Sequence, residues 1–178
     1  MQLETERLVL RVPEESDVDA WTEMYAQPAV ERWLSARSRE QVADYIREIR
    51  ERHSADGFGV LAVVRKDDGR VIGRGGMLVW DDRTWMPTTL SDAAAHGEVE
   101  IGWALHPDVW GRGYATEASV ACREFVLTQV RPRVIALIDP ENVRSIAVAE
   151  RLGLAHERDV LLKGEKVARV YAVVRERP

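Results

Sequence analysis

A chain of 178 residues, 46% hydrophobic and 31% charged, has the size and composition of one soluble globular domain, which we expect to span residues 1–178. Its formal net charge of −5 disfavours nucleic acid as a partner and suits a cationic or amine-bearing one. The single cysteine, Cys122, excludes an intrachain disulfide, and no apolar run approaches the ~18 residues of a membrane span, so we expect a cytoplasmic protein.

The first half of the chain is predicted to contain one strand, two amphipathic helices and a β-hairpin. Apolar residues recur at steps of three and four where helices are expected, and they alternate or run together where strands are expected. Asp67, Asp68 and Gly69 supply the turn of the hairpin. The expected elements are the strand 7–12, the helices 14–25 and 39–53, and the strands 60–64 and 71–80.

The second half begins with residues 83–96, which include Pro87 and an alanine triplet and are predicted to form a mobile loop. Strands and helices then alternate before a closing hairpin. The expected elements are the strand 98–105, the helix 115–129, the strand 133–138, the helix 142–152, and the strands 154–162 and 166–175 around Lys163, Gly164 and Glu165. This order predicts an α/β fold with a mixed sheet and helices on both faces.

Residues 97–117 are the most informative segment, because a strand there leads through Gly111, Arg112 and Gly113 into a helix that starts near Ala115. A helix N-terminus after a glycine loop presents unpaired backbone N–H groups, which favour a phosphate. The segment is neither a Walker A loop nor a GxGxxG dinucleotide fingerprint. Taken alone, the loop is equally compatible with a simple tight turn.

Three segments resemble the GNAT superfamily of N-acetyltransferases, and within it the ribosomal-protein N-terminal-acetyltransferase (RimJ/RimL-like) branch. They are LETERLVLR near the start, EIGWALHPDVWGRGYATEA in the middle and DPENVRSIAVAERLGL near the end. The family signature Gln/Arg-x-x-Gly-x-Gly/Ala corresponds to residues 110–115, with Trp110 in place of the first Gln or Arg. The resemblance implies a single-domain GNAT fold with a mixed, mostly antiparallel sheet.

The resemblance also implies acetyl-CoA as co-substrate, with its pyrophosphate on residues 111–116 and its pantetheine arm beside residues 103–105. The last helix would lie near the thiol end of the cofactor. The expected cofactor-binding residues are Trp103, Ala104, Leu105, Trp110, Gly111, Arg112, Gly113, Tyr114, Ala115, Thr116, Asn142 and Ser145.

Acetyl transfer to an amine needs a base for the amine and donors for the tetrahedral oxyanion. Glu98, Glu100, Gly102 and Ala104 share one face of the expected strand, and its opposite face carries Val99, Ile101, Trp103 and Leu105. Glu100 is the first candidate for the general base and Glu98 the second. The alternative is that both carboxylates are solvated or paired with arginines. A backbone N–H within 102–105 is the expected oxyanion donor.

Asn142 and Ser145 match the family's N-x-x-[AS] start of the last helix. Many relatives place a tyrosine acid seven residues after this Asn, where the present chain has Ala149. Ser145 is therefore a candidate to hydrogen-bond the departing sulfur. The alternative is that Asn142 only caps the helix with Ser145 in its first turn, or that Asp139 and Pro140 cap it instead.

The segments expected to face the acceptor carry no motif that identifies it. Trp33, Trp80 and Trp85 are candidate acceptor contacts, and the four histidines lack metal-ligand spacing, so no metal site is expected. The favoured acceptor is a protein N-terminal α-amine, and the alternatives are a small-molecule amine (an antibiotic, polyamine or amino-acid derivative) or a non-catalytic acyl-CoA-binding regulatory module. A homodimer is left open.

Overall fold

The computed structural model describes residues 1–162 and 166–175, so the predicted turn at 163–165 lies outside the described residues. The chain forms two compact units, each made of two segments. The first unit comprises residues 1–76 and 103–121, and the second comprises residues 77–102 and those from 122 onward.

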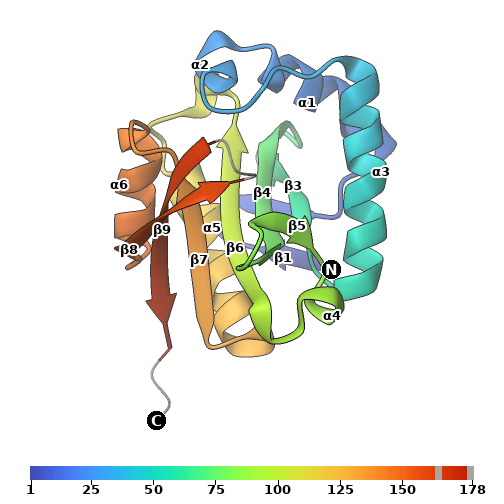
Figure 1. Ribbon diagram of the computed structural model, residues 1–178. Coiled ribbons are helices and arrows are strands. Elements are labelled where there is room, and N and C mark those ends of the chain that lie inside the picture. The colour runs from blue at the N-terminus through green and yellow to red at the C-terminus, as the bar shows by residue number, and fades with distance from the viewer. Residues whose placement is uncertain (163–165, 176–178) are drawn as a thin grey trace. The chain divides into compact units, whose positions relative to one another are not determined.

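The first unit contains three consecutive antiparallel strand pairings and the N-terminal helices (Figure 1). Strand β1 pairs with β2, β2 with β3, and β3 with the first half of β4, so the three pairings follow chain order. The elements are β1 Gln2–Glu4, β2 Leu8–Arg11, α1 Val18–Tyr25, α2 Pro28–Glu31, α3 Arg39–Asp56, β3 Val60–Arg65 and β4 Val71–Asp81.

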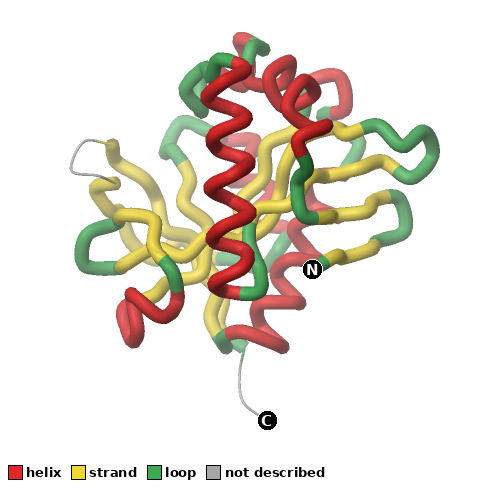
Figure 2. The backbone as a smooth tube through the Cα atoms, turned by 90° about the vertical axis from the view of Figure 1, so that its right-hand side faces the viewer, coloured by secondary structure: helices red, strands yellow, loops and turns green. Residues whose placement is uncertain are grey.

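Helices α1 and α3 bury their apolar faces in one core together with β3. Trp21, Met24 and Tyr25 of α1 are almost fully buried there, as are Val42 and Ile46 of α3. Figure 2 shows α3 as the long helix facing the viewer. Burial of an aromatic or aliphatic side chain stabilises by about 1.5–3 kcal/mol, so this core anchors both helices.

The ends of α3 follow from two local signals. Ser38 and Gln41 form a capping box, in which the Ser38 hydroxyl accepts from Gln41 N–H and Gln41 Oε1 accepts from Ser38 N–H. Gly57 ends the helix in the left-handed conformation with φ of 76°. The helix therefore begins where it is predicted and runs three residues beyond 53, up to this glycine.

Gly73 marks a close approach between β4 and the end of β6 (Gly97–Leu105). Its φ is 146°, and a Cβ added there would lie 2.3 Å from the Ala104 carbonyl oxygen and 2.7 Å from Leu105 Cα. The carbonyl of Gly73 also accepts from the Trp21 indole N–H at 3.1 Å. Only glycine fits this position without displacing the β6 backbone.

The second unit is built on β6, β7, β9 and β8, with β6 and β7 parallel and the other neighbours antiparallel (Figure 1). Trp80, Trp85, Ile135 and Val170 form its buried apolar cluster. Its further elements are β5 Met86–Thr88, α4 Leu90–Ala93, β7 Arg133–Ile138, α6 Val143–Arg151, β8 Ala155–Leu162 and β9 Lys166–Val174. Helix α5 Tyr114–Phe125 ends in a π-helical turn, Val126–Val130.

Residues 83–96 were predicted to be a loop without regular structure, and this prediction is wrong. The segment contains β5, α4 and a 3-10 turn, Ala94–His96. Local side-chain bonds organise it. The Asp81 carboxylate accepts from Arg83 Nε at 3.0 Å and from Arg83 N–H at 2.9 Å. These two hydrogen bonds hold the pKa of Asp81 well below its usual range. Thr89 Oγ1 accepts from Asp92 N–H at 3.2 Å and caps α4.

Most other predicted elements are confirmed, including both hairpins and the mixed sheet. The first predicted helix is shorter than expected, since residues 15–17 form a 3-10 turn before α1. Cys122 is buried in α5, which raises the pKa of its thiol to about 12. In the part of the chain that the structure describes, no helix has the length and apolar character needed to cross a bilayer.

Candidate active site

The glycine loop places two left-handed glycines directly before α5. Gly111 has a φ of 75° and Gly113 a φ of 81°, and both are exposed. The first hydrogen bond of α5 runs from Glu117 N–H to the Gly113 carbonyl at 2.9 Å, so the amides of residues 114–116 precede the helical ladder. The Arg112 side chain is also exposed. Amides at a helix N-terminus beside an exposed arginine form a suitable site for a phosphate.

Trp110, which departs from the family signature, ties the start of this loop to β6. Its indole N–H donates to the Leu105 carbonyl at 2.7 Å. Next to it, His106 N–H donates to the Ile72 carbonyl of β4 at 2.9 Å. The tryptophan therefore holds the loop against the end of the strand from which it departs.

Residues 103–105, expected to pair with the pantetheine arm, do not follow the predicted alternation. The pattern of buried odd-numbered and half-buried even-numbered positions runs from residue 97 to 102, after which Trp103 is half-buried and Ala104 is buried. Burial therefore alternates over 97–102 as the predicted faces require, and its order is reversed at Trp103 and Ala104. Ala104 belongs to the core that contains Trp21.

Sequence reasoning assigned no role to Arg7 and Glu117, which the structure joins behind the glycine loop. Arg7 Nε donates to Glu117 Oε2 at 2.7 Å, and Arg7 Nη1 donates to the Arg112 carbonyl at 3.0 Å. Both residues lie in segments that resemble the family. Their pairing spans 110 positions of the chain, a separation over which no local pattern gives a signal.

Glu100 lies on β6 opposite Ile135 of the parallel strand β7. Its Oε2 accepts from the Trp80 indole N–H at 2.6 Å, and its Oε1 accepts from Leu137 N–H at 3.4 Å. The side chain is half-buried. These donors, one from β4 and one from β7, hold the carboxylate in a defined orientation, as a general base requires.

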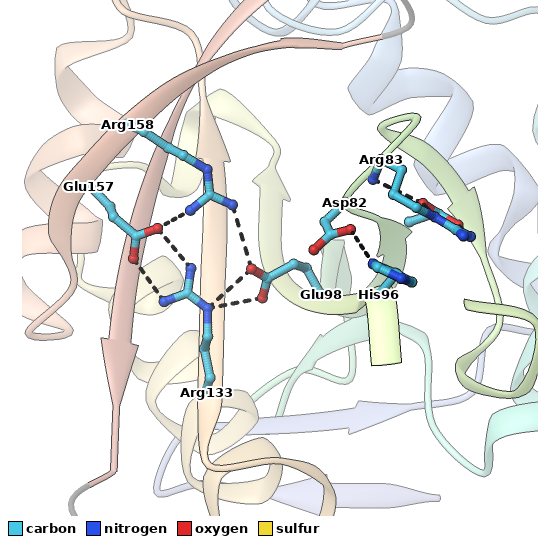
Figure 3. A network of polar contacts seen from close by, with 8 residues as sticks. Asp82, Arg83, His96, Glu98, Arg133, Glu157 and Arg158 are labelled. Carbon is cyan, nitrogen blue, oxygen red and sulfur yellow. Dashed lines mark hydrogen bonds and ion pairs between the residues drawn. The ribbon is translucent and has the colours of Figure 1, made fainter. Parts of the chain in front are cut away.

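Glu98, two residues earlier on β6, belongs to an ion-pair network instead (Figure 3). Arg133 Nε lies 3.1 and 3.0 Å from the two Glu98 oxygens, and Arg158 Nη2 lies 3.7 Å from Oε1. Arg133 also donates to Glu157 at 2.8 Å. Burial acts to lower the pKa of Arg133, but the hydrogen bonds to Glu157 and Glu98 outweigh it and raise that pKa. Glu98 is therefore paired with arginines, which is the alternative that the sequence left open.

The three tryptophans considered as acceptor contacts lie in different surroundings. Trp80 and Trp85 are each only 8% exposed and belong to the apolar cluster of the second unit. Trp85 has a φ of 51°, a conformation that is strained for a bulky residue. Trp33 is half-buried, with the Arg32 guanidinium 4.6 Å from its ring centroid.

Asn142 caps helix α6, and Ser145 lies in its first turn. Asn142 Oδ1 accepts from Ser145 N–H at 3.1 Å, while the Asp139 carboxylate accepts from Glu141 N–H and does not cap the helix. Asn142 is therefore the cap, and the alternative that Asp139 and Pro140 supply it is wrong. The Ser145 side chain is half-buried, and Ala149, in the family's tyrosine position, is fully buried.

We expect Asn142→Ala to lower the free energy of unfolding by about 1 kcal/mol, because one amide of the first turn of α6 loses its acceptor. Asn142→Ser retains a capping oxygen and should remain within about 0.5 kcal/mol of the parent. Urea unfolding followed by circular dichroism measures both values. Equal stability of the parent and the alanine variant would contradict the capping role.

The histidines do not assemble a metal site. His106 Nδ1 lies 2.7 Å from Asp108 Oδ1, and His96 Nδ1 lies 3.1 Å from Asp82 Oδ1. Across residues 1–162 and 166–175, no three His, Cys, Asp or Glu side chains are grouped so that they could hold a metal ion.

Comparison with known proteins identifies the family. Residues 7–155 match the family described as the acetyltransferase (GNAT) domain. The uncharacterized N-acetyltransferase p20 of Bacillus licheniformis is 27% identical over 159 residues, 87% of this chain and 83% of that protein. The crystal structure of an acetyltransferase of Agrobacterium tumefaciens superposes with a TM-score of 0.78 at 25% identity, covering 98% of this chain and 95% of that one.

A ribosomal alpha-N-protein acetyltransferase in complex with coenzyme A shares the fold, with a TM-score of 0.76 at 16% identity over 98% of both chains. The family match extends over the glycine loop, β6 and α6. The chain therefore belongs to the GNAT family of acetyltransferases and is an acyltransferase whose acyl donor is acetyl-CoA.

Proposed function

We propose that residues 1–178 act as one N-acetyltransferase domain in the cytoplasm, transferring the acetyl group of acetyl-CoA to a primary amine. The favoured acceptor is a protein N-terminal α-amine, as in the ribosomal-protein branch that the sequence resembles. The observation that carries the proposal is the exposed turn of Gly111 and Gly113 directly before α5, with the exposed Arg112 between them.

The diphosphate of acetyl-CoA binds to the amides of residues 111–116, and Arg112 adds a charge-assisted contact. The pantetheine arm follows residues 103–105. Because the Leu105 carbonyl already accepts from Trp110 and the Ala104 carbonyl oxygen lies against Gly73, the backbone groups of Trp103 are the better partners for the arm. Coenzyme binding by these groups needs no metal.

Transfer proceeds by direct attack in a ternary complex. The neutral amine nitrogen attacks the thioester carbonyl carbon, so that a C–N bond forms, and collapse of the tetrahedral intermediate breaks the C–S bond. Glu100 accepts the proton that the amine loses, directly or through water, and an amide within 102–105 stabilises the oxyanion. The thiolate of coenzyme A, whose thiol has a pKa of about 8.5, leaves and takes up a proton, and Ser145 is the candidate donor of a hydrogen bond to it.

The acceptor preference rests on the cost of deprotonation. An α-amine with a pKa of about 8 is about one-tenth neutral at pH 7, a cost of roughly 1.4 kcal/mol. A lysine amine with a pKa of about 10.4 costs about 4.6 kcal/mol to deprotonate at the same pH. One carboxylate is therefore adequate for an N-terminus and less so for lysine. The net charge of −5 also suits a cationic acceptor.

A panel of peptides with free N-termini, matched N-formylated peptides containing lysine, and small amines tests the proposal. Release of free thiol and mass spectrometry of the products identify the acceptor. We expect acetylation of free peptide N-termini and none of the blocked peptides. Preferential acetylation of the small amines would favour a small-molecule acceptor, and binding of acetyl-CoA without release above background would indicate a non-catalytic module.

A further inference from the structure

The residues that precede β2 hold a carboxylate in the first turn of α5. Glu117 Oε1 accepts from the Thr5 hydroxyl at 2.5 Å and from Arg7 N–H at 2.9 Å. Glu117 Oε2 accepts from Arg7 Nε at 2.7 Å and lies 2.6 Å from Arg7 Nη2. Such a forked arginine–carboxylate contact fixes orientation as well as charge. The Arg7 guanidinium is therefore held in place directly behind the glycine loop.

Arg7 uses its remaining donor group on the loop itself. Nη1 donates to the Arg112 carbonyl at 3.0 Å, and the guanidinium carbon lies 4.4 Å from the centroid of the buried Tyr114 ring. No described peptide bond is cis. In a trans peptide, the carbonyl of one residue and the N–H of the next point in opposite directions. By holding the Arg112 carbonyl, Arg7 therefore turns the Gly113 N–H away from its own guanidinium.

The same contact removes an electrostatic conflict. A carboxylate in the first turn of a helix lies near the amides on which an anion would bind, and it would repel that anion if it were unpaired. Burial acts to raise the pKa of Glu117, but the hydrogen bonds from Thr5 and Arg7 outweigh it and lower that pKa. Glu117 is therefore ionised at neutral pH, and Arg7 neutralises it.

We propose that Arg7 is a positioning residue for the coenzyme diphosphate: anchored by Glu117 and Thr5, it orients the Gly113 amide and cancels the charge of Glu117. This inference rests on the proposed function. Arg7 touches neither the thioester nor the acceptor in this account. Substituting Arg7 should therefore affect the reaction only with acyl donors that carry the diphosphate.

The test compares two acyl donors, acetyl-CoA and S-acetylpantetheine, which has the same thioester and lacks the diphosphate. The test variants are Arg7→Lys, which keeps the charge but cannot reach Glu117 and the Arg112 carbonyl with one forked group, and Glu117→Gln, which removes the partner charge. The matched control is Arg39→Lys, in an exposed ion pair with Asp19 on α1. Steady-state kinetics and calorimetric binding of coenzyme A are the readouts.

For Arg7→Lys we expect the Kd of coenzyme A and the KM of acetyl-CoA to rise about tenfold, with kcat at saturating acetyl-CoA unchanged. Glu117→Gln loses the anchor of Arg7 but also the carboxylate that would repel the diphosphate, so both constants should rise by less, about threefold, again with kcat unchanged. The kcat/KM for S-acetylpantetheine should equal that of the parent, and Arg39→Lys should match the parent with both donors. If Arg7→Lys fails to fold, Glu117→Gln carries the test.

Equal losses with both donors, or a fall in kcat alone, would assign Arg7 a merely structural role and overturn the inference. An unchanged KM for acetyl-CoA in both variants would also overturn it. A parent enzyme that uses the two donors with equal kcat/KM would instead contradict the diphosphate site itself. The donor preference of the parent thus tests the diphosphate site, and the KM values of the variants test the role of Arg7.

Discussion

Glu100→Gln is expected to lower kcat/KM about 100-fold at pH 7, the scale of a lost general base, and less than about tenfold at pH 9. Glutamine has the same shape and can still accept from the Trp80 indole, so the geometry around β6 is retained. The difference between the two pH values arises because an α-amine with a pKa of about 8 is mostly neutral at pH 9 without assistance. Initial rates with a peptide acceptor at both pH values measure the effect.

Two substitutions of the same kind serve as references for Glu100→Gln. Glu48→Gln, in an exposed pair with Arg52 on α3, should leave the rate unchanged at both pH values. Glu98→Gln weakens the pairing with Arg133, so any loss should be independent of pH. A loss for Glu100→Gln that is equal at pH 7 and pH 9 would contradict its role as the base.

Gly73→Ala is expected to lower the free energy of unfolding by about 4 kcal/mol. The new Cβ would lie 2.3 Å from the Ala104 carbonyl oxygen, and the φ of 146° is one that alanine rarely adopts. Overpacking costs about 1–3 kcal/mol and a strained backbone conformation costs a similar amount. Urea unfolding at 25 °C measures the change.

Two other glycines separate the clash from the strain. Gly69→Ala places a Cβ where nothing lies within 4 Å, at a φ of 68°, so it should cost about 1 kcal/mol from strain alone. Gly59→Ala meets only His53 atoms, at 3.6 Å or more, and carries no such strain, so it should cost less than about 1 kcal/mol. If Gly73→Ala cost no more than Gly69→Ala, the close approach of β4 and β6 would be contradicted.

Long elements were predictable because they repeat their period several times and carry end signals. Strand β7, a run of apolar residues between two polar segments, has the predicted bounds of 133–138. Helix α3 begins at Arg39 as predicted. Short elements escaped prediction, because three or four residues, as in β1, β5 and α4, complete too little of any period to be recognised.

The candidate site was predictable only where chemistry is local in sequence. Two glycines before a helix marked the loop, and the Asn142 cap followed from its position before α6. The pairing of Glu98 with Arg133 and of Arg7 with Glu117 joins residues 35 and 110 positions apart. Such contacts depend on tertiary structure, so the sequence left open whether Glu98 was a base or an arginine partner.

The most direct test of the central claim is a titration of the 15N-labelled protein with coenzyme A, followed through its assigned backbone amides. We expect the largest chemical-shift changes at Gly111, Gly113 and the amides of residues 114–116. Pantetheine, which lacks the diphosphate of coenzyme A, should leave these resonances in place. Binding that shifts other amides and leaves this loop unchanged would contradict the account.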